Sequence, residues 1–377
     1  MAKALRLTRA GNLGAATRLI QATLNPAAGN PLVSGKAFRN MHALTSMDAL
    51  QRYLPSAPVK APTPKAKTPS KPKRSTKALT AARTTTADRA SSFTERSFSG
   101  PTGTLAYWLY LPSRPTSGLP VVIMLHGCTQ TPKDFASGTQ MNLLAEELGF
   151  IVAYPEQPAS ANMSRCWNWF KPGDQRRDSG EPAKIAALTR EIVAEHAADP
   201  SRVYVAGLSA GGAAAAILGA AYPDVYAAIG VHSGLACGAA TSVASAFTAM
   251  RSGSAQTHGC GHKGQFVPVI TFHGDKDGTV NPVNSAQIVA NAVDAIGMPL
   301  ASTRQQGGTA QGRAYTRDIN CSDDGKAQIE QWTIHGASHA WSGGHASGTY
   351  TDAQGPDASR AMATFFLQHS LPKSTGG

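Results

Sequence analysis

The stretch RVYVAGLSAGGAAAA, residues 202–216, joins two different sequence patterns at a single serine. Residues 202–207 alternate in the manner of a strand, and the alanine-rich residues 210–221 are typical of a helix. Ser209 stands between them, in the pattern Gly-Leu-Ser-Ala-Gly. An ordinary turn does not need a serine between glycines, whereas a nucleophile at a sharp strand-to-helix turn does. We therefore interpret Ser209 as a candidate nucleophile.

Strands and helices alternate along the chain on both sides of this stretch. Short, continuous apolar runs such as residues 119–127 are typical of strands that are buried on both faces. The alternation predicts an α/β fold with a doubly wound, mostly parallel sheet that is covered by helices on both faces. The expected strands are 104–112, 119–127, 150–155, 202–207, 227–234, 266–274 and 327–336. The expected helices are 135–148, 181–197, 210–221, 282–296 and 357–370.

The turn at Ser209 would strain the serine backbone and lift its hydroxyl above the edge of the sheet. The flanking residues must be glycines, because side chains there would collide with the neighbouring strand and helix. The helix that follows directs its N-terminus at the site, which favours developing negative charge. The backbone N–H groups of Ala210 and of Cys128, in the loop LHGCTQ, are the candidates for an oxyanion hole. His126 is interpreted as a support for that loop.

A serine hydroxyl needs a base to take its proton, and in this architecture an acid and then a histidine follow the serine along the chain. The acid is expected directly after a later strand, where VITFHGDKDGTV offers Asp275 and Asp277. After the last strand, WTIHGASHAWSGGH offers three histidines, His335, His339 and His345. We interpret His335, at the strand end, as a packing residue. His339 lies among small residues in the loop and is the preferred base.

The positive charge of the chain is concentrated near its N-terminus. Residues 1–95 hold 16 Lys and Arg and three acidic residues, and the remaining residues hold 19 and 20, so the net charge of +12 divides into +13 and −1. This distribution argues against nucleic-acid binding by the body of the protein. Residues 1–54 are expected to form a flexible extension that contains an amphipathic helix. Residues 55–96 are expected to be a disordered linker rich in Pro, Lys and Ala, and 97–377 the catalytic domain.

Other features of the sequence exclude several classes of protein. No run of about 18 apolar residues is present, so we expect no transmembrane helix. The charged N-terminus does not resemble a secretory signal peptide. The five cysteines are spaced in a way that suits no zinc site, and we expect neither a metal nor a cofactor. The basic N-terminal extension is a candidate anchor to an anionic or polymer surface.

Six stretches, in this order, resemble the polyhydroxybutyrate depolymerase family of α/β-hydrolase esterases: VVIMLHGCTQ, FIVAYPEQ, CWNWF, DPSRVYVAGLSAGGAAAA, FHGDKDGTV and HAWSGG. The resemblance spans about residues 98–370, which is nearly all of the expected catalytic domain. The resemblance implies a triad of Ser209, Asp277 and His339. It favours Asp277 over Asp275, which then becomes a turn residue with an Asx-type hydrogen bond. It also implies hydrolysis of 3-hydroxyalkanoate or other short acyl esters, and feruloyl or acetylxylan esters are the alternative substrates.

The resemblance further implies that Cys128 and Cys166 form a disulfide that braces the oxyanion loop. Cys237 and Cys321 are the expected second pair, which leaves Cys260 unpaired. Disulfides persist in oxidising compartments. An extracellular or periplasmic location is therefore expected, and a cytoplasmic location is the alternative because no signal peptide is visible.

Two tryptophans near the expected site, Trp167 and Trp341, are candidate substrate contacts, because aromatic rings would suit an apolar ester chain. The alternative is that both are simply packed. The last residues, LPKSTGG, do not resemble a polymer-binding domain, so we expect soluble esters or oligomers rather than crystalline polymer as substrates. The alternative from another class is a granule or surface adhesion protein with a hydrolase-like body. An intact set of Ser, Asp and His argues against it.

Overall fold

A computed structural model describes residues 90–254, 266–310 and 312–372 of the chain. The amphipathic helix expected near the N-terminus and most of the expected linker lie outside these residues. The first strand, β1 (Ser92–Gly100), pairs along its whole length with β2 (Gly103–Leu111). The domain boundary expected at residue 97 therefore cuts through a strand, and the folded body includes all of β1.

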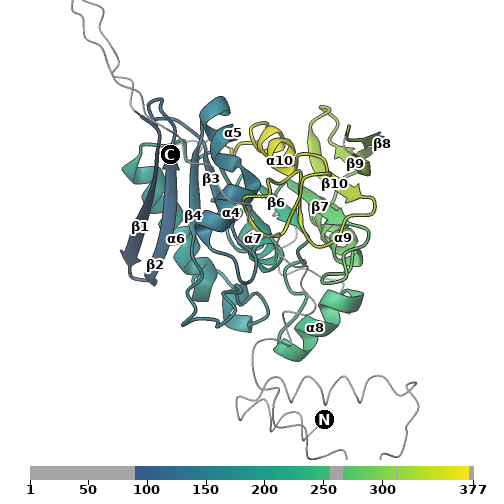
Figure 1. Cartoon of the computed structure of the whole chain (residues 1–377), viewed down its shortest axis with the longest axis horizontal. Coiled ribbons are helices and arrows are strands. Elements are labelled where there is room, and N and C mark those ends of the chain that lie inside the picture. The colour runs from purple at the N-terminus through teal and green to yellow at the C-terminus, as the bar shows by residue number, and fades with distance from the viewer. Residues whose placement is uncertain (1–89, 255–265, 311, 373–377) are drawn as a thin grey trace, which may run out of the picture. The chain divides into compact units, whose positions relative to one another are not determined.

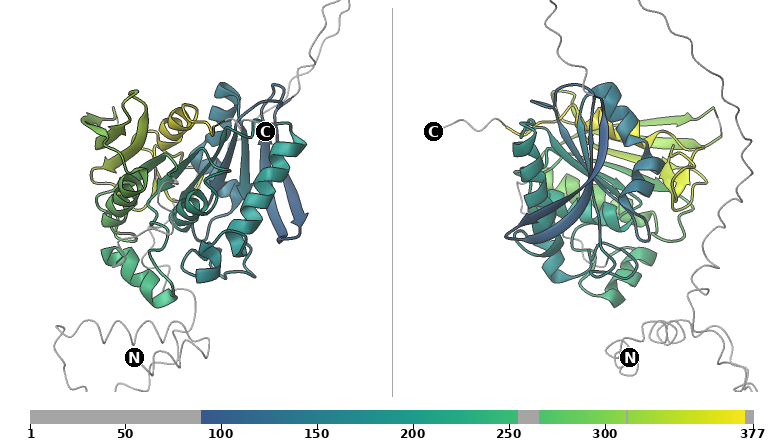
Figure 2. Two further views of the ribbon diagram at one scale, coloured as in Figure 1. Left: turned by 180° about the vertical axis from the view of Figure 1, so that it is seen from behind. Right: turned by 60° about the vertical axis from the view of Figure 1, so that its left-hand side comes forward.

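The described residues form one large sheet with helices on both faces (Figures 1 and 2). Its strand order is β1-β2-β4-β3-β5-β6-β7-β10-β9-β8. The remaining strands of this sheet are β3 (Val121–Leu125), β4 (Ile151–Pro155), β5 (Val203–Leu208), β6 (Ala228–His232), β7 (Val269–Gly274), β8 (Ala301–Gly308), β9 (Ala314–Cys321) and β10 (Ala327–Ile334). The helices are α4 (Pro132–Thr139), α5 (Met141–Leu148), η2 (Pro172–Gln175), α6 (Gly180–Glu195), α7 (Ala210–Ala221), α8 (Val243–Ser252), α9 (Val283–Ile296) and α10 (Ala358–Phe366). Two short strands, β11 (Trp341–Ser342) and β12 (Thr351–Asp352), pair separately.

The six central strands, from β4 to β10 in the sheet order, are all parallel. The outer strands on both sides, β1 and β2 on one side and β9 and β8 on the other, are antiparallel. The prediction of a mostly parallel, doubly wound sheet is confirmed. Because parallel strands place their carboxyl ends at one edge, the loops after β3, β5, β6, β7 and β10 meet there.

The central strands are buried on both faces, because successive side chains of a strand point to opposite sides. In β3, Val121, Ile123 and Leu125 belong to the core that includes α6 and α7. The intervening Val122 and Met124 belong to the other core, which includes side chains of α4, α5 and α10. The continuous apolar run of β3 is thus explained by two hydrophobic layers that share one strand.

Several elements differ from the expectation. The helix expected over 135–148 is two helices, α4 and α5, because Gln140 between them has a left-handed φ of 54°. Helix α8 and the antiparallel strands β1, β8 and β9 were not expected from the sequence. Seven of the eight residues of β8 are exposed, so this edge strand has no apolar pattern from which it could be recognised.

Candidate active site

Ser209 lies at the junction of β5 and α7, in a backbone conformation that is rare for a residue with a side chain. Its φ is 57° and its ψ is −118°, and it stands as the N-cap of α7. A Cβ atom at Gly211 would overlap the carbonyl oxygen of Leu125 on β3, and one at Gly207 would overlap the backbone of Gly211. The glycines are therefore needed for close approach of the backbones, and the serine carries the strain.

Asp277 and His339 are joined by a hydrogen bond of 2.7 Å between the His339 Nδ1 and the Asp277 Oδ2. The other carboxylate oxygen, Oδ1, accepts the backbone N–H groups of Thr279 and Val280, each at 2.9 Å. Burial on its own would raise the pKa of Asp277, but hydrogen bonds from His273 and His339 and the charge of His339 hold that pKa well below its usual range. The carboxylate is fixed and ionised, and it orients the imidazole so that Nε2 points away from it.

The loop after β10 brings His339 toward the loop after β7. The backbone N–H of Lys276 donates to the Ala337 carbonyl oxygen at 3.0 Å, and Gly274 at the end of β7 is packed against the same residue. The His339 side chain is 12% exposed, so it is accessible at one edge. Among the described residues, the Ser209 hydroxyl makes no hydrogen bond to this ring. Catalytic hydrogen bonds in unliganded sites often tighten only when substrate binds.

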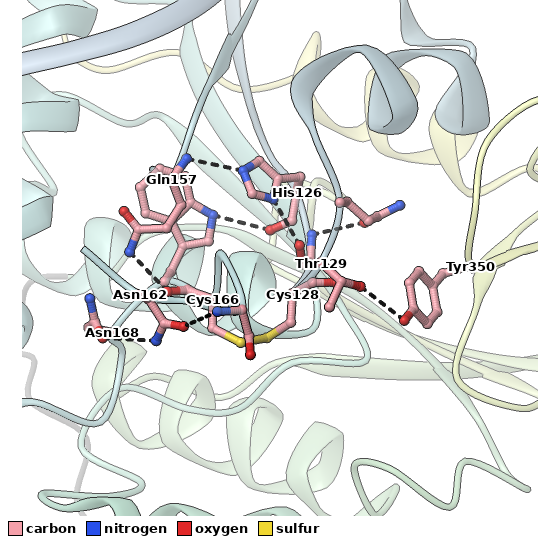
Figure 3. The surroundings of a disulfide bond; sticks show 12 residues. His126, Cys128, Thr129, Gln157, Asn162, Cys166, Asn168 and Tyr350 are labelled. Carbon is pink, nitrogen blue, oxygen red and sulfur yellow. Dashed lines mark hydrogen bonds between the residues drawn. A yellow bond between two sulfur atoms is a disulfide. The ribbon is translucent and has the colours of Figure 1, made fainter. Parts of the chain in front are cut away.

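The loop after β3 is held by the buried ring of His126 (Figure 3). Its Nδ1 donates to the Gly127 carbonyl oxygen at 2.8 Å, and its Nε2 accepts the backbone N–H of Gln157 at 3.1 Å. Burial lowers the pKa of His126 to about 4, so the ring stays neutral and can serve as donor and acceptor at once. His126 supports the loop, as its place in the sequence suggests.

A disulfide between Cys128 and Cys166 joins this loop to the segment before α6. Beside it, the N–H of Thr129 donates to the Ser164 carbonyl oxygen at 2.7 Å. Within the described residues, neither the N–H of Cys128 nor that of Ala210 takes part in a hydrogen bond. The first N–H groups of a helix have no partner inside the helix, so that of Ala210 is available to a ligand.

The second expected disulfide is wrong. Cys237 is disulfide-bonded, but Cys321 is a free cysteine. Cys321 ends β9 on the antiparallel side of the sheet, whereas Cys237 follows β6 and packs in the core beside α7. The spacing of the cysteines along the sequence does not show that Cys237 and Cys321 lie in different parts of the fold. Cys260 lies outside the described residues.

The two candidate tryptophans are packed in the core of the folded body. Trp167 and Trp341 are both completely buried. The Trp167 indole N–H donates to the His126 carbonyl oxygen at 3.1 Å, and that of Trp341 donates to the Ser359 hydroxyl at 3.0 Å. This burial favours the packing alternative. Trp167 also lines a cavity together with Gln157 and Asn168, and contact of either ring with substrate stays a prediction.

Asp275 and His335 also differ from the expectation. The Asp275 carboxylate accepts the N–H of Gly336 at 2.7 Å and lies 3.2 Å from the His335 Nδ1, so it ties together two loops rather than closing its own turn. His335 is exposed rather than packed, with 43% of its side chain accessible. The Asx-type bonds of this loop belong to Asp277 instead. The third histidine, His345, is exposed and bonds the Ser347 hydroxyl.

Sequence reasoning does not single out His232, at the end of β6. Its carbonyl oxygen accepts the N–H of Ser209, and its ring accepts the N–H of Ser342, each at 2.9 Å. Its place at the carboxyl end of a buried strand is the one signal that could have drawn attention to it. In the part of the chain that the structure describes, no group of acidic, histidine and cysteine side chains could hold a metal ion. No helix there is long and apolar enough to span a membrane.

The fold resembles that of a solved acetyl xylan esterase from Aspergillus awamori. The match has a TM-score of 0.58 at 21% identity and covers 73% of this chain and 99% of that one. The fold and the junction at Ser209 are those of an α/β-hydrolase. Residues 105–313 match the family model for esterase PHB depolymerase, and the chain belongs to this family.

Two curated relatives support this assignment. Poly(3-hydroxyalkanoate) depolymerase C of Paucimonas lemoignei is 35% identical over 248 residues, which are 63% of this chain and 58% of that protein. Feruloyl esterase B of Thermothelomyces thermophilus is 28% identical over 259 residues, which are 60% of this chain and 86% of that protein. The chain thus spans little more than half the length of the depolymerase and most of the feruloyl esterase.

Proposed function

We propose that this protein is a serine esterase that cleaves short acyl or 3-hydroxyalkanoate esters with Ser209 as nucleophile, His339 as base and Asp277 as the orienting acid. The observation that carries the proposal is the 2.7 Å bond between a buried, ionised Asp277 and His339. The strained strand-to-helix turn at Ser209 supports it. Family membership and the name of the Paucimonas relative support the substrate class.

The reaction proceeds in two steps. His339 removes the proton of Ser209 while its Oγ attacks the ester carbonyl carbon, and Asp277 stabilises the imidazolium that forms. The N–H groups of Ala210 and Cys128 donate to the oxyanion, assisted by the N-terminus of α7. His339 then protonates the leaving alcohol. A water molecule, deprotonated by His339, attacks the acyl-enzyme and releases the acid.

Replacement of the nucleophile tests this mechanism. Ser209→Ala should lower kcat for p-nitrophenyl butyrate by roughly three to six orders of magnitude. Ser252→Ala is the matched control, because Ser252 is exposed and its hydroxyl bonds only a carbonyl oxygen of its own helix. A fluorophosphonate probe should label the native protein at Ser209. A non-catalytic adhesion protein would not react with the probe, and that outcome, or full activity of Ser209→Ala, contradicts the proposal.

The alternative substrate class is feruloyl or acetylated xylan esters, which the names of the Thermothelomyces relative and of the Aspergillus structure favour. Initial rates on 3-hydroxybutyrate oligomers, methyl ferulate and acetylated xylan, measured with the same preparation, separate the two classes. Higher kcat/KM on the oligomers supports the first proposal. Higher kcat/KM on methyl ferulate or acetylated xylan supports the alternative.

We further propose that the protein acts in an oxidising compartment outside the cytoplasm, because Cys128 and Cys166 are paired and Cys237 is also disulfide-bonded. Alkylation of free thiols in freshly lysed cells, followed by mass spectrometry, tests this. Unmodified Cys128 and Cys166 peptides agree with the proposal, and alkylated ones contradict it.

A further inference from the structure

His232 is a buried histidine that the proposed mechanism does not use. It ends β6, between the strand that carries the nucleophile and the strand that carries Asp277, and it is 1% exposed. A buried polar ring is stable only when its nitrogen atoms have hydrogen-bond partners. The partners of His232 therefore indicate what the residue does.

The two bonds of His232 connect the two halves of the catalytic site. Its carbonyl oxygen accepts the N–H of Ser209 at 2.9 Å. Its Nε2 accepts the N–H of Ser342, also at 2.9 Å, and Ser342 stands three residues after His339 in the same loop. One residue thus holds the backbone of the nucleophile and the loop of the base.

The ring is also fixed in its protonation state and its plane. Because Nε2 accepts a hydrogen bond, Nδ1 carries the proton and donates to the Ser233 hydroxyl at 3.1 Å. Burial, with the nearby His273 and His339, lowers the pKa of His232 well below its usual range. The ring is stacked between Phe272, with centroids 5.7 Å apart, and Trp341, with centroids 5.0 Å apart.

We propose that His232 is a positioning residue that sets the placement of His339 relative to Ser209, because its carbonyl oxygen accepts the N–H of Ser209 and its neutral imidazole accepts the N–H of Ser342. This inference rests on the proposed function of Ser209 and His339. A displacement of about 1 Å in a reacting group can lower the rate about 100-fold. The ring does not contact the substrate, so its loss should change kcat and leave KM nearly unchanged.

Two variants of equal polarity and different reach separate positioning from packing. In His232→Gln, Oε1 lies about as far along the side chain as Nε2 and can accept the N–H of Ser342, whereas the shorter Asn in His232→Asn cannot. Both variants lose the stacked ring. We expect His232→Asn to lower kcat for p-nitrophenyl butyrate by about 100-fold relative to the native protein. The kcat of His232→Gln should be at least about tenfold higher than that of His232→Asn. KM should stay within about twofold in both variants.

Comparison of these two variants tests the positioning role even if both lose stability. Both variants lose the stacked ring, so thermal melts should show a similar loss of stability in each. The difference in kcat between them, measured at a temperature where both are folded, reports the hydrogen bond to Ser342. Equal kcat in His232→Gln and His232→Asn, or kcat of the native protein in His232→Asn, overturns the inference. Ser209→Ala, measured in parallel, separates this from failure of the proposed function, because an active Ser209→Ala protein would contradict the nucleophile itself.

Discussion

Removal of the disulfide between Cys128 and Cys166 should lower the free energy of unfolding by about 4 kcal/mol. The two cysteines are 38 residues apart along the chain. In the chain-entropy model, a cross-link that closes a loop of this length removes about 13 cal/mol/K from the entropy of the unfolded chain, or about 4 kcal/mol at 25 °C. The double variant Cys128→Ala/Cys166→Ala removes the bond without leaving an unpaired thiol.

Equilibrium unfolding in urea, followed by tryptophan fluorescence, measures this loss. The control is Cys321→Ala, because Cys321 is a free cysteine and its replacement breaks no disulfide. All proteins are measured without reductant, since Cys237 is also disulfide-bonded. A loss below about 1 kcal/mol in the double variant would refute the reasoning that the cross-link acts mainly by restricting the unfolded chain.

The same variant tests the role of the loop in catalysis. The proposed oxyanion donor at position 128 is a backbone N–H, which Ala also has. The N–H of Thr129 still bonds the Ser164 carbonyl oxygen, so the loop stays close to its place. We therefore expect kcat to fall by about tenfold, less than the 100-fold or more that follows removal of an oxyanion donor. A loss as large as that would mean that the disulfide alone positions the loop.

Three other predictions follow from individual contacts. Gly211→Ala should abolish soluble expression or lower the melting temperature strongly, because the added Cβ would overlap the Leu125 carbonyl oxygen. The control Gly278→Ala should melt like the native protein, since no atom lies within 4 Å of its added Cβ. Burial lowers the pKa of His126 to about 4 from 6.5. As pH falls from 6.5 toward 4, the histidine is protonated in the unfolded chain before it is protonated in the folded protein. This difference should lower the free energy of unfolding by roughly 3 kcal/mol. Urea unfolding at pH 7 and pH 4.5 should show a smaller loss in His126→Gln, and equal losses would contradict this assignment. Glu330→Ala should lower the free energy of unfolding by about 3 kcal/mol, since it leaves the Arg317 guanidinium and the Trp332 indole N–H without their buried partner. Asp318→Asn, which breaks an exposed pair with Arg304, should change it within experimental error, and similar losses in both variants would refute the argument.

The central sheet could be predicted from sequence because its strands are buried on both faces and so appear as continuous apolar runs. The antiparallel strands could not. β8 is exposed at seven of its eight residues, and β1 is mostly polar, with Phe93 and Phe98 as its large apolar side chains. For such strands the pairing partner, not the local pattern, determines the structure.

The candidate site divides in the same way. Ser209 and His339 each follow a strand in a short motif, so local sequence was enough to propose them. For the acid, local sequence left Asp275 and Asp277 open, and the family resemblance favoured Asp277. The partners that hold them are distant in the chain. Nothing in the sequence near residue 232 indicates a bond to Ser342, and nothing near Asp275 indicates that its carboxylate reaches Gly336. Such contacts depend on which strands are neighbours, and that order appears only in the folded sheet.

The arrangement of the site suggests why two buried histidines stand beside it. His126 holds the loop of one proposed oxyanion donor, and His232 holds the loop of the base. A neutral imidazole has one donor and one acceptor on a flat ring, so it can bond two backbone groups while it packs against aromatic neighbours. A carboxylate or an ammonium group in the same places would require a buried counter-ion. Since burial lowers the pKa of both rings, both supports keep their hydrogen bonds while the pH stays near neutral. Protonation of either ring would break the bond that its Nε2 accepts, and the loop held by that bond would lose this support.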